Sequence, residues 1–197
     1  HRARGARVTV MKRAWPLLLT VMACDSTTLP GESMGSWSFQ VTPVEYACGL
    51  SDVSDAGFGF TASLSHDRAS TQAWMLVGGY VRDAGFDGQY FDTTQDAARI
   101  FTQCSVCTTR MVETMRFAVL SQSQWSALGS CVYDGGIPLP DDAGIRAPGP
   151  TGQGYDAQHL CGEMTEQVVS DGLADGGACP AECDGCFVRY QLQGTRG

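Results

Sequence analysis

The chain has 197 residues, of which 43% are hydrophobic, and it carries 13 basic and 21 acidic side chains. Charge is unevenly distributed, because no Asp or Glu precedes Cys24 whereas five basic residues do: Arg2, Arg4, Arg7, Lys12 and Arg13. From Cys24 onward eight basic side chains face 21 acidic ones, a net charge of −13. This excess of negative charge excludes nucleic acid as an expected partner and argues against binding to anionic lipid through charge.

The N-terminal region has the order of a secretory signal. The basic stub Met11–Arg13 is followed by the largely apolar run Ala14–Ala23 and then by Cys24. As a helix this run is about 15 Å long, roughly half of the hydrocarbon core of a bilayer, which is too short for a permanent span. We therefore expect residues 1–23 to be a signal region that is removed, with residues 1–10 an upstream extension.

The last four residues of this region, Val21–Cys24, resemble the lipobox of bacterial lipoproteins. The resemblance covers residues 11–24 only. It implies that the thiol of Cys24 receives a diacylglycerol and that the signal is cut before this residue. It also implies a location in the cell envelope, with lipid on Cys24 in the inner or outer membrane and the domain in the periplasm or at the cell surface. Asp25 resembles the inner-membrane retention signal of some Gram-negative lipoproteins, and the choice of membrane stays open.

The remaining cysteines are even in number: Cys48, Cys104, Cys107, Cys131, Cys161, Cys179, Cys183 and Cys186. An exported domain lies in a compartment where disulfides persist, so we expect up to four bridges, with 105 possible connectivities. Removing 23 residues from 197 leaves 174, which is enough for one domain with its own core. We assign residues 24–35 to the lipidated cysteine and a polar tether, and residues 36–197 to a single β-rich, Cys-rich domain.

Several segments alternate apolar and polar residues with the period of two that is typical of half-buried strands. These segments are Trp37–Val41, Phe58–Leu64, Trp74–Val77, Gln89–Phe91, Met111–Leu120 and Phe187–Gln193. Residues 160–169 fit either a strand or a helix.

Helical patterns are few, namely Thr94–Phe101 and one turn at Ser121–Leu128. Turns that combine Asp with Gly, such as Asp83–Gly85 and Asp87–Gly88, separate the other elements. Residues 135–154, rich in Pro and Gly, indicate a long surface loop. Many short strands between turns predict a mainly β fold, an antiparallel sandwich or barrel with few short helices and with disulfide links.

Cysteine spacing permits two metal sites in principle. The Cys-x2-Cys pairs that begin at Cys104 and Cys183 could meet around zinc, but such a site needs reduced thiols, which an oxidising compartment disfavours. The spacing of Cys179, Cys183 and Cys186 resembles the cluster-binding signature of radical S-adenosylmethionine enzymes, although that signature opens an α/β barrel near an N-terminus. Disulfides are the preferred interpretation, and we predict no metal and no cofactor.

Patterns for nucleophilic catalysis are weak. Beyond Cys24 only His66 and His159 are available as histidine bases, and the adjacent Ser65, His66 and Asp67 would point to opposite faces of a strand. His159 follows Asp156 without a nucleophile motif. We assign no catalytic residue from these patterns.

Three glutamates, Glu113, Glu163 and Glu166, are candidates for the paired carboxylates of glycoside hydrolysis, although sequence spacing does not give their distance in space. The sequence as a whole predicts an envelope-anchored lipoprotein that acts as a non-enzymatic binding or structural module for an unspecified protein or glycan. The alternative is a zinc-binding or hydrolytic envelope protein.

Overall fold

A computed structural model describes residues 28–50, 56–131, 155–173 and 177–197, residue 184 excepted. The signal region, Cys24 and the predicted loop at 135–154 lie outside these residues. None of the described helices is long and apolar enough to span a membrane.

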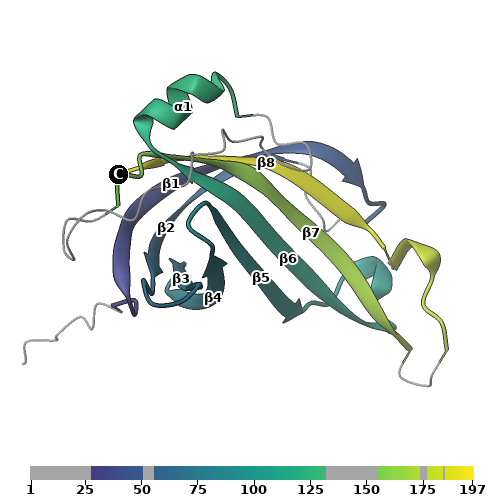
Figure 1. The fold of residues 1–197 in the computed structure, drawn as a ribbon. Helices are drawn as coiled ribbons and strands as arrows, with labels where there is room; N and C mark the ends of the chain where they lie inside the picture. Colours follow the sequence, from purple (N-terminus) through teal and green to yellow (C-terminus); the bar gives the residue numbers. More distant parts are fainter. Residues whose placement is uncertain (1–27, 51–55, 132–154, 174–176, 184) are drawn as a thin grey trace, which may run out of the picture.

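Eight antiparallel strands form a closed barrel in which consecutive strands pair and the last strand pairs with the first (Figure 1). The strands are β1 (Glu32–Ala47), β2 (Phe58–His66), β3 (Gln72–Val77), β4 (Tyr80–Phe86), β5 (Tyr90–Ala98), β6 (Cys107–Leu120), β7 (His159–Leu173) and β8 (Phe187–Arg196). Short helices are η1 (Thr102–Cys104), α1 (Gln122–Leu128) and η2 (Ala181–Cys183). The prediction of a mainly β, antiparallel and disulfide-linked fold is confirmed, and it takes the form of a barrel.

The period-two patterns point one face of each strand into the barrel. Phe39, Phe91 and Phe117 are fully buried there, with Phe91 stacked on Phe117 at 5.1 Å between ring centroids. Burying side chains of this size contributes roughly 2 to 3 kcal/mol each. Eight-stranded barrels have an interior that side chains can fill, and aromatic rings fill the middle of this one.

A smaller apolar cluster lies on the outer face of β6 and β7. Ser121 caps α1, its side chain accepting a hydrogen bond from Gln124 N while the Gln124 side chain bonds Ser121 N in return. The helix then packs Trp125 and Leu128 against the buried Leu120. The predicted helical turn is thus a real helix that covers part of the outside of the barrel.

Three local predictions were wrong. Thr94–Phe101 does not form a helix, because residues 94–98 continue β5 and pair with β6 in an unbroken register. Asp83–Gly85 is not a turn, because these residues lie inside β4 and pair with β3. Residues 32–35, which we assigned to the tether, are the start of β1. In each case pairing with a neighbouring strand outweighs the local pattern.

The two ends of the barrel differ. At one end, which we call the closed end, the buried Tyr155 contacts His66 at the end of β2 and Phe86 at the end of β4. Arg196, at the end of β8, donates to the carbonyl oxygen of Tyr155 at 2.7 Å. The segment before β7 therefore lies across this end, next to the start of β1.

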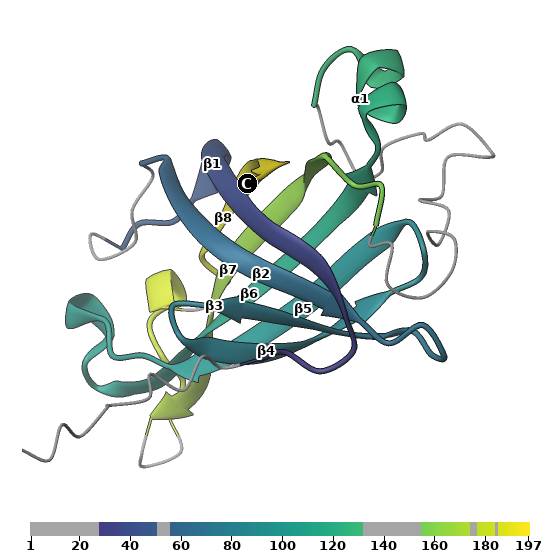
Figure 2. The ribbon, with the colours of Figure 1, turned by 90° about the vertical axis from the view of Figure 1, so that its left-hand side faces the viewer.

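The opposite end, which we call the open end, holds three of the four disulfides. The pairs are Cys48–Cys186, Cys104–Cys183 and Cys107–Cys179, and the fourth pair, Cys131–Cys161, lies beside α1. Their Cα–Cα distances of 4.5 to 6.0 Å suit a disulfide. Figures 1 and 2 show η1 and η2 side by side at this end, far from α1, where the Cys104–Cys183 bridge joins them.

Candidate functional site

The open end exposes part of the inner face of the barrel. β2 pairs with β1 only as far as Val41, and β4 pairs with β5 only as far as Thr93. Beyond these points β1, β8, β7, β6 and β5 continue as a five-stranded wall. Gln95 and Ala97 of β5 pair with Glu113 and Met111 of β6 and so lie on the inner face of the wall. Both are nevertheless exposed. Solvent therefore reaches the inner face of this wall from the side of the shorter strands.

Two glutamates face each other on this inner wall. Glu113 of β6 pairs directly with Glu166 of β7. On the inner face this pair comes next to the buried pair of Met115 and Met164. Directly opposed residues of an antiparallel pair have Cβ atoms about 5 Å apart. The barrel thus brings together two of the three glutamates that the sequence offered as a carboxylate pair.

Each carboxyl has its own partner. Glu113 forms an ion pair with Arg82, which reaches across from β4, and both side chains are less than one-fifth exposed. Glu166 instead accepts a hydrogen bond from the hydroxyl of Tyr190 on β8, at 3.2 Å. One carboxylate is therefore compensated by a full positive charge and the other by a neutral hydroxyl.

This difference affects protonation. Burial raises the pKa of the Glu166 carboxyl above its ordinary value, and the neighbouring Glu113 raises it further. The hydrogen bond from Tyr190 and the charge of Arg99 act in the opposite direction without cancelling the effect. Glu166 consequently holds its proton to a higher pH than an exposed glutamate does.

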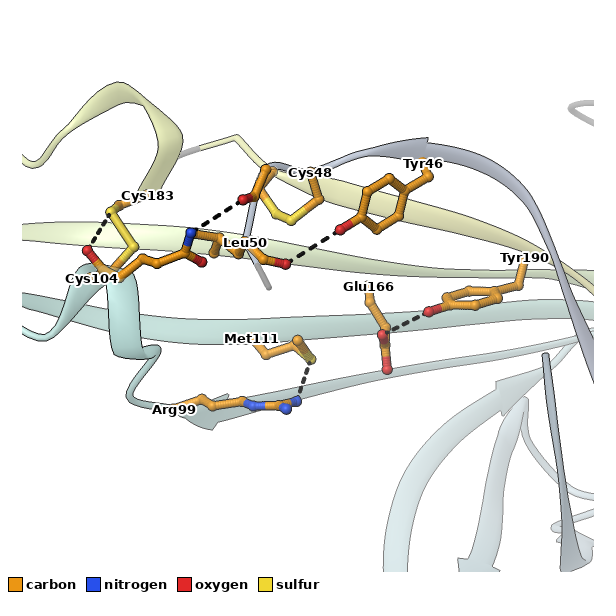
Figure 3. Close-up of a disulfide and its surroundings, with 12 residues drawn as sticks. Tyr46, Cys48, Leu50, Arg99, Cys104, Met111, Glu166, Cys183 and Tyr190 are labelled. Atoms are coloured by element: carbon orange, nitrogen blue, oxygen red, sulfur yellow. Dashed lines mark hydrogen bonds between the residues drawn. A yellow bond between two sulfur atoms is a disulfide. The ribbon is translucent and has the colours of Figure 1, made fainter. Parts of the chain in front are cut away.

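Figure 3 shows Glu166 and Tyr190 pointing toward each other below the disulfide-linked segments. Arg99, at the end of β5, lies near the thioether of Met111 at 3.4 Å and carries its charge over the ring of Phe101. The hydroxyl of Tyr46 donates to the backbone carbonyl oxygen of Leu50, a residue that is fully buried. The inner wall at the open end therefore combines acids, arginines, tyrosines and a thioether.

Apolar side chains surround the same end. The large hydrophobic side chains that are exposed in the described part of the chain lie in segments toward this end, with Val81 on the outer face of β4: Val44, Tyr46, Phe58, Tyr80, Val81, Ile100 and Val106. Phe58 is 40% exposed and meets the ring of Tyr190 edge-on at 5.8 Å, so it links this apolar ring to the carboxyl pair. Apolar groups gathered in one place mark a surface that binds something.

Other sequence candidates are separated by the fold. Glu163 lies on the opposite, outer face of β7, across from Arg116. At the closed end His66 bonds the Tyr155 hydroxyl and the Ser70 carbonyl oxygen, at 2.8 and 2.9 Å, while Asp67 accepts from Ala69 N and the Ser70 hydroxyl in a turn. Both ring nitrogens of His66 are engaged, and no nucleophile approaches them among the described residues.

His159 and the cysteine pairs likewise form no catalytic or metal centre. His159 stacks on Trp125 at 4.8 Å and bonds the side chain of Gln122. The four thiols that could have met around zinc are all in disulfides instead, Cys104 with Cys183, Cys107 with Cys179 and Cys186 with Cys48. Within the described residues no three potential ligands are grouped so as to hold a metal ion.

Sequence reasoning missed Arg82, Arg99 and Tyr190. Arg82 directly precedes the predicted turn Asp83–Gly85 and was assigned to no element. Arg99 lies in the predicted helix Thr94–Phe101. Tyr190 lies in the segment Phe187–Gln193 that we predicted as a strand, but nothing local links it to Glu166, which is 24 residues away. Only the strand order, which places β8 beside β7, brings the two together.

Comparison with known proteins adds no relative. No protein-family model matches the chain, and neither a curated protein nor a solved structure does.

Proposed function

We propose that the chain is an envelope-anchored lipoprotein whose barrel is a non-enzymatic binding module, with the ligand held at the open end. The observation that carries this proposal is the concentration of exposed apolar side chains around an inner wall that bears Glu113, Glu166 and Tyr190. Lipid on Cys24 anchors the chain. β1 begins at the closed end, so the described chain starts at the end of the barrel opposite the proposed binding end.

The ligand suited to this end is small and amphipathic. Its apolar part contacts Phe58, while a hydrogen-bonding group reaches the carboxyl of Glu166. Pockets that bind such ligands are mostly apolar with a few polar groups that fix orientation.

Displacement of the fluorescent probe N-phenyl-1-naphthylamine tests this proposal. We expect micromolar binding of the probe by the purified mature chain, weakened at least fivefold by Phe58→Ala. Glu166→Gln should change which polar analogues displace the probe. Glu163→Gln, on the outer face of the same strand, is the matched control and should bind like the wild type. Absence of probe binding, or equal binding by all variants, would contradict the proposal.

Anchoring is tested separately. Wild-type protein should incorporate labelled palmitate and sediment with membranes, whereas Cys24→Ser should do neither. A Cys24→Ser protein that still carries lipid label in the membrane fraction would refute the anchor.

A hydrolytic function is the second candidate, and the Glu113 and Glu166 pair is the observation that favours it. Two carboxyl groups with different protonation behaviour supply an acid and a nucleophile or base in glycosidases. In this scheme the carboxyl of Glu166 donates its proton to the leaving oxygen while Glu113, which is ion-paired with Arg82, attacks the sugar carbon and the glycosidic bond breaks. A water molecule that gives a proton to Glu166 then hydrolyses the glycosyl ester on Glu113. A panel of nitrophenyl glycosides tests it: turnover by wild type and Glu163→Gln but not by Glu166→Gln supports hydrolysis, and no turnover refutes it.

A further inference from the structure

The wall of the barrel is weakest between β4 and β5. Three residue pairs join these strands, Ala84 with Thr93, Gly85 with Asp92 and Phe86 with Phe91. Past Thr93, whose hydroxyl donates to the Asp83 carbonyl oxygen at 2.9 Å, the strands separate. β4 continues along β3 and β5 continues along β6, so residues 94–98 have no strand on their β4 side within the described chain.

Backbone groups of β5 face this free edge at every second residue. Arg99 N donates to Thr109 O on β6, and the Tyr90 carbonyl oxygen accepts from Asp87 N on the β4 side. Because these directions alternate along a strand, odd positions bond β6 and even positions face β4. The N–H groups of Thr94, Asp96 and Ala98 therefore point to the free edge, and residues 94–98 are exposed throughout.

A second free edge at this end, on β1, is protected. β1 beyond Val41 also lacks a neighbour on its β2 side among the described residues, but it contains Pro43 and a register shift between Pro43 and Glu45. Proline and bulges are the usual means of preventing a free strand from pairing with another chain. The β5 edge contains neither of them, and it has an unbroken register with β6.

Surrounding side chains indicate what would pair there. Tyr80, the first residue of β4, and Ile100, two residues past the end of β5, are 79% and 82% exposed, which favours an occupant with apolar side chains. Three acids project from the outer face beside the edge: Asp83, Asp92 and Asp96. Two arginines lie near them, Arg116 in an ion pair with Asp92 and Arg110 in an ion pair with Asp96, so the acids outnumber the arginines. The chain from Cys24 onward is also strongly acidic. Two copies of so acidic a chain repel each other through their net charge, which disfavours a second copy as the occupant.

We propose that the free edge of β5, residues 94–98, binds an extended segment of a partner protein, with apolar residues on one face and Lys or Arg on the other. The segment adds a strand to the barrel wall between β5 and β4. Main-chain hydrogen bonds to Thr94, Asp96 and Ala98 supply affinity, and the acids beside the edge select a basic partner.

The test measures fluorescence anisotropy of an eight-residue alternating Lys-Val peptide with the mature chain. An alternating Glu-Val peptide serves as the charge control. We expect at least tenfold tighter binding of the basic peptide, and slower amide exchange at Thr94, Asp96 and Ala98 when it is bound. Equal affinity for both peptides, or no binding of either, would overturn the proposal.

Variants of the edge complete the test. Ala98→Pro removes the backbone N–H that Ala98 presents at the free edge and leaves intact the odd-numbered residues of β5 that bond β6. It should weaken binding of the Lys-Val peptide at least tenfold. Asp96→Lys, which keeps the backbone, should weaken it at least fivefold and covers the case in which Ala98→Pro does not fold. Glu163→Lys adds the same charge on the outer face of a fully paired strand and should have no effect. Wild-type affinity in a folded Ala98→Pro or in Asp96→Lys would refute the edge as the binding site.

Discussion

Gly162 occupies a position on β7 where only a hydrogen atom fits. It faces into the barrel opposite Phe117, and a Cβ atom built there would overlap the Arg116 carbonyl oxygen and the backbone of Phe117. The obstructing atoms are mostly backbone of a central strand, so they cannot move aside as a flexible side chain would. The close approach of β6 and β7 at the middle of the barrel depends on this glycine.

We predict that Gly162→Ala lowers the free energy of unfolding by about 3 kcal/mol, since overpacking against backbone forces the strands apart. Urea denaturation of the mature chain measures it. Gly49→Ala is the control, because a Cβ there meets nothing within 4 Å, and it should change stability by less than about 0.5 kcal/mol. Equal effects of the two substitutions would contradict the close approach of β6 and β7 at Gly162.

Glu166 makes stability depend on pH in a direction set by its raised pKa. The unfolded chain loses this proton near the ordinary glutamate value, whereas the folded chain keeps it to higher pH. In the interval between the two values the folded state binds more protons, so stability falls as pH rises. Below this pH interval the contribution of the protonated Glu166 carboxyl to stability is fully present, and above the interval that contribution is lost.

Replacing Glu166 by Gln removes this titration and keeps a group that can accept from Tyr190. We predict that the variant gains stability relative to the wild type as pH rises from 4 through 7, in thermal unfolding followed by circular dichroism. Glu163→Gln should keep the pH profile of the wild type. A wild-type profile in Glu166→Gln would mean that the carboxyl is not buried as described.

At the scale of elements, strands with strict alternation could be predicted from sequence and those without it could not. Trp37–Val41 and Phe187–Gln193 were found because one face of each is buried along its whole length. β4 was missed because Asp83–Gly85 has turn chemistry. The second half of β5 was mistaken for a helix because residues 94–98 are exposed on both faces and show no alternation. Their strand state comes from pairing with β3 and β6, which no local pattern contains.

The candidate site follows the same division. Glu113 and Glu166 could be proposed from sequence, but their meeting depends on the register between β6 and β7. Arg82 and Tyr190 come from β4 and β8, which become neighbours of this pair only when the barrel closes. Eight cysteines implied four disulfides correctly, whereas their pairing required the strand order.

Across the whole molecule, disulfides are concentrated where strand pairing is incomplete. Cys48–Cys186, Cys104–Cys183 and Cys107–Cys179 link the segments beyond the ends of β1, β5 and β7 at the open end. These covalent links fix the extended wall that the shorter β2, β3 and β4 leave uncovered. The rest of the barrel is held by the antiparallel pairing of its strands.

The fourth disulfide, Cys131–Cys161, closes a sequence separation of 30 residues. We predict that the double variant Cys131→Ala with Cys161→Ala loses about 3 to 4 kcal/mol, because the unfolded chain regains loop entropy. Guanidinium denaturation at matched ionic strength measures the loss. A change below about 1 kcal/mol would mean that the bridge does not constrain the unfolded chain.

The proposed lipid anchor and the disulfide-linked barrel are tested together, and most directly, by the intact mass and disulfide map of the protein purified from the membrane fraction without reductant. The predicted result is a chain that begins at Cys24 and carries a diacylglycerol, contains no free thiol, and joins its other eight cysteines in the four pairs described. A chain without lipid, a different N-terminus, or four or more free thiols would contradict the account.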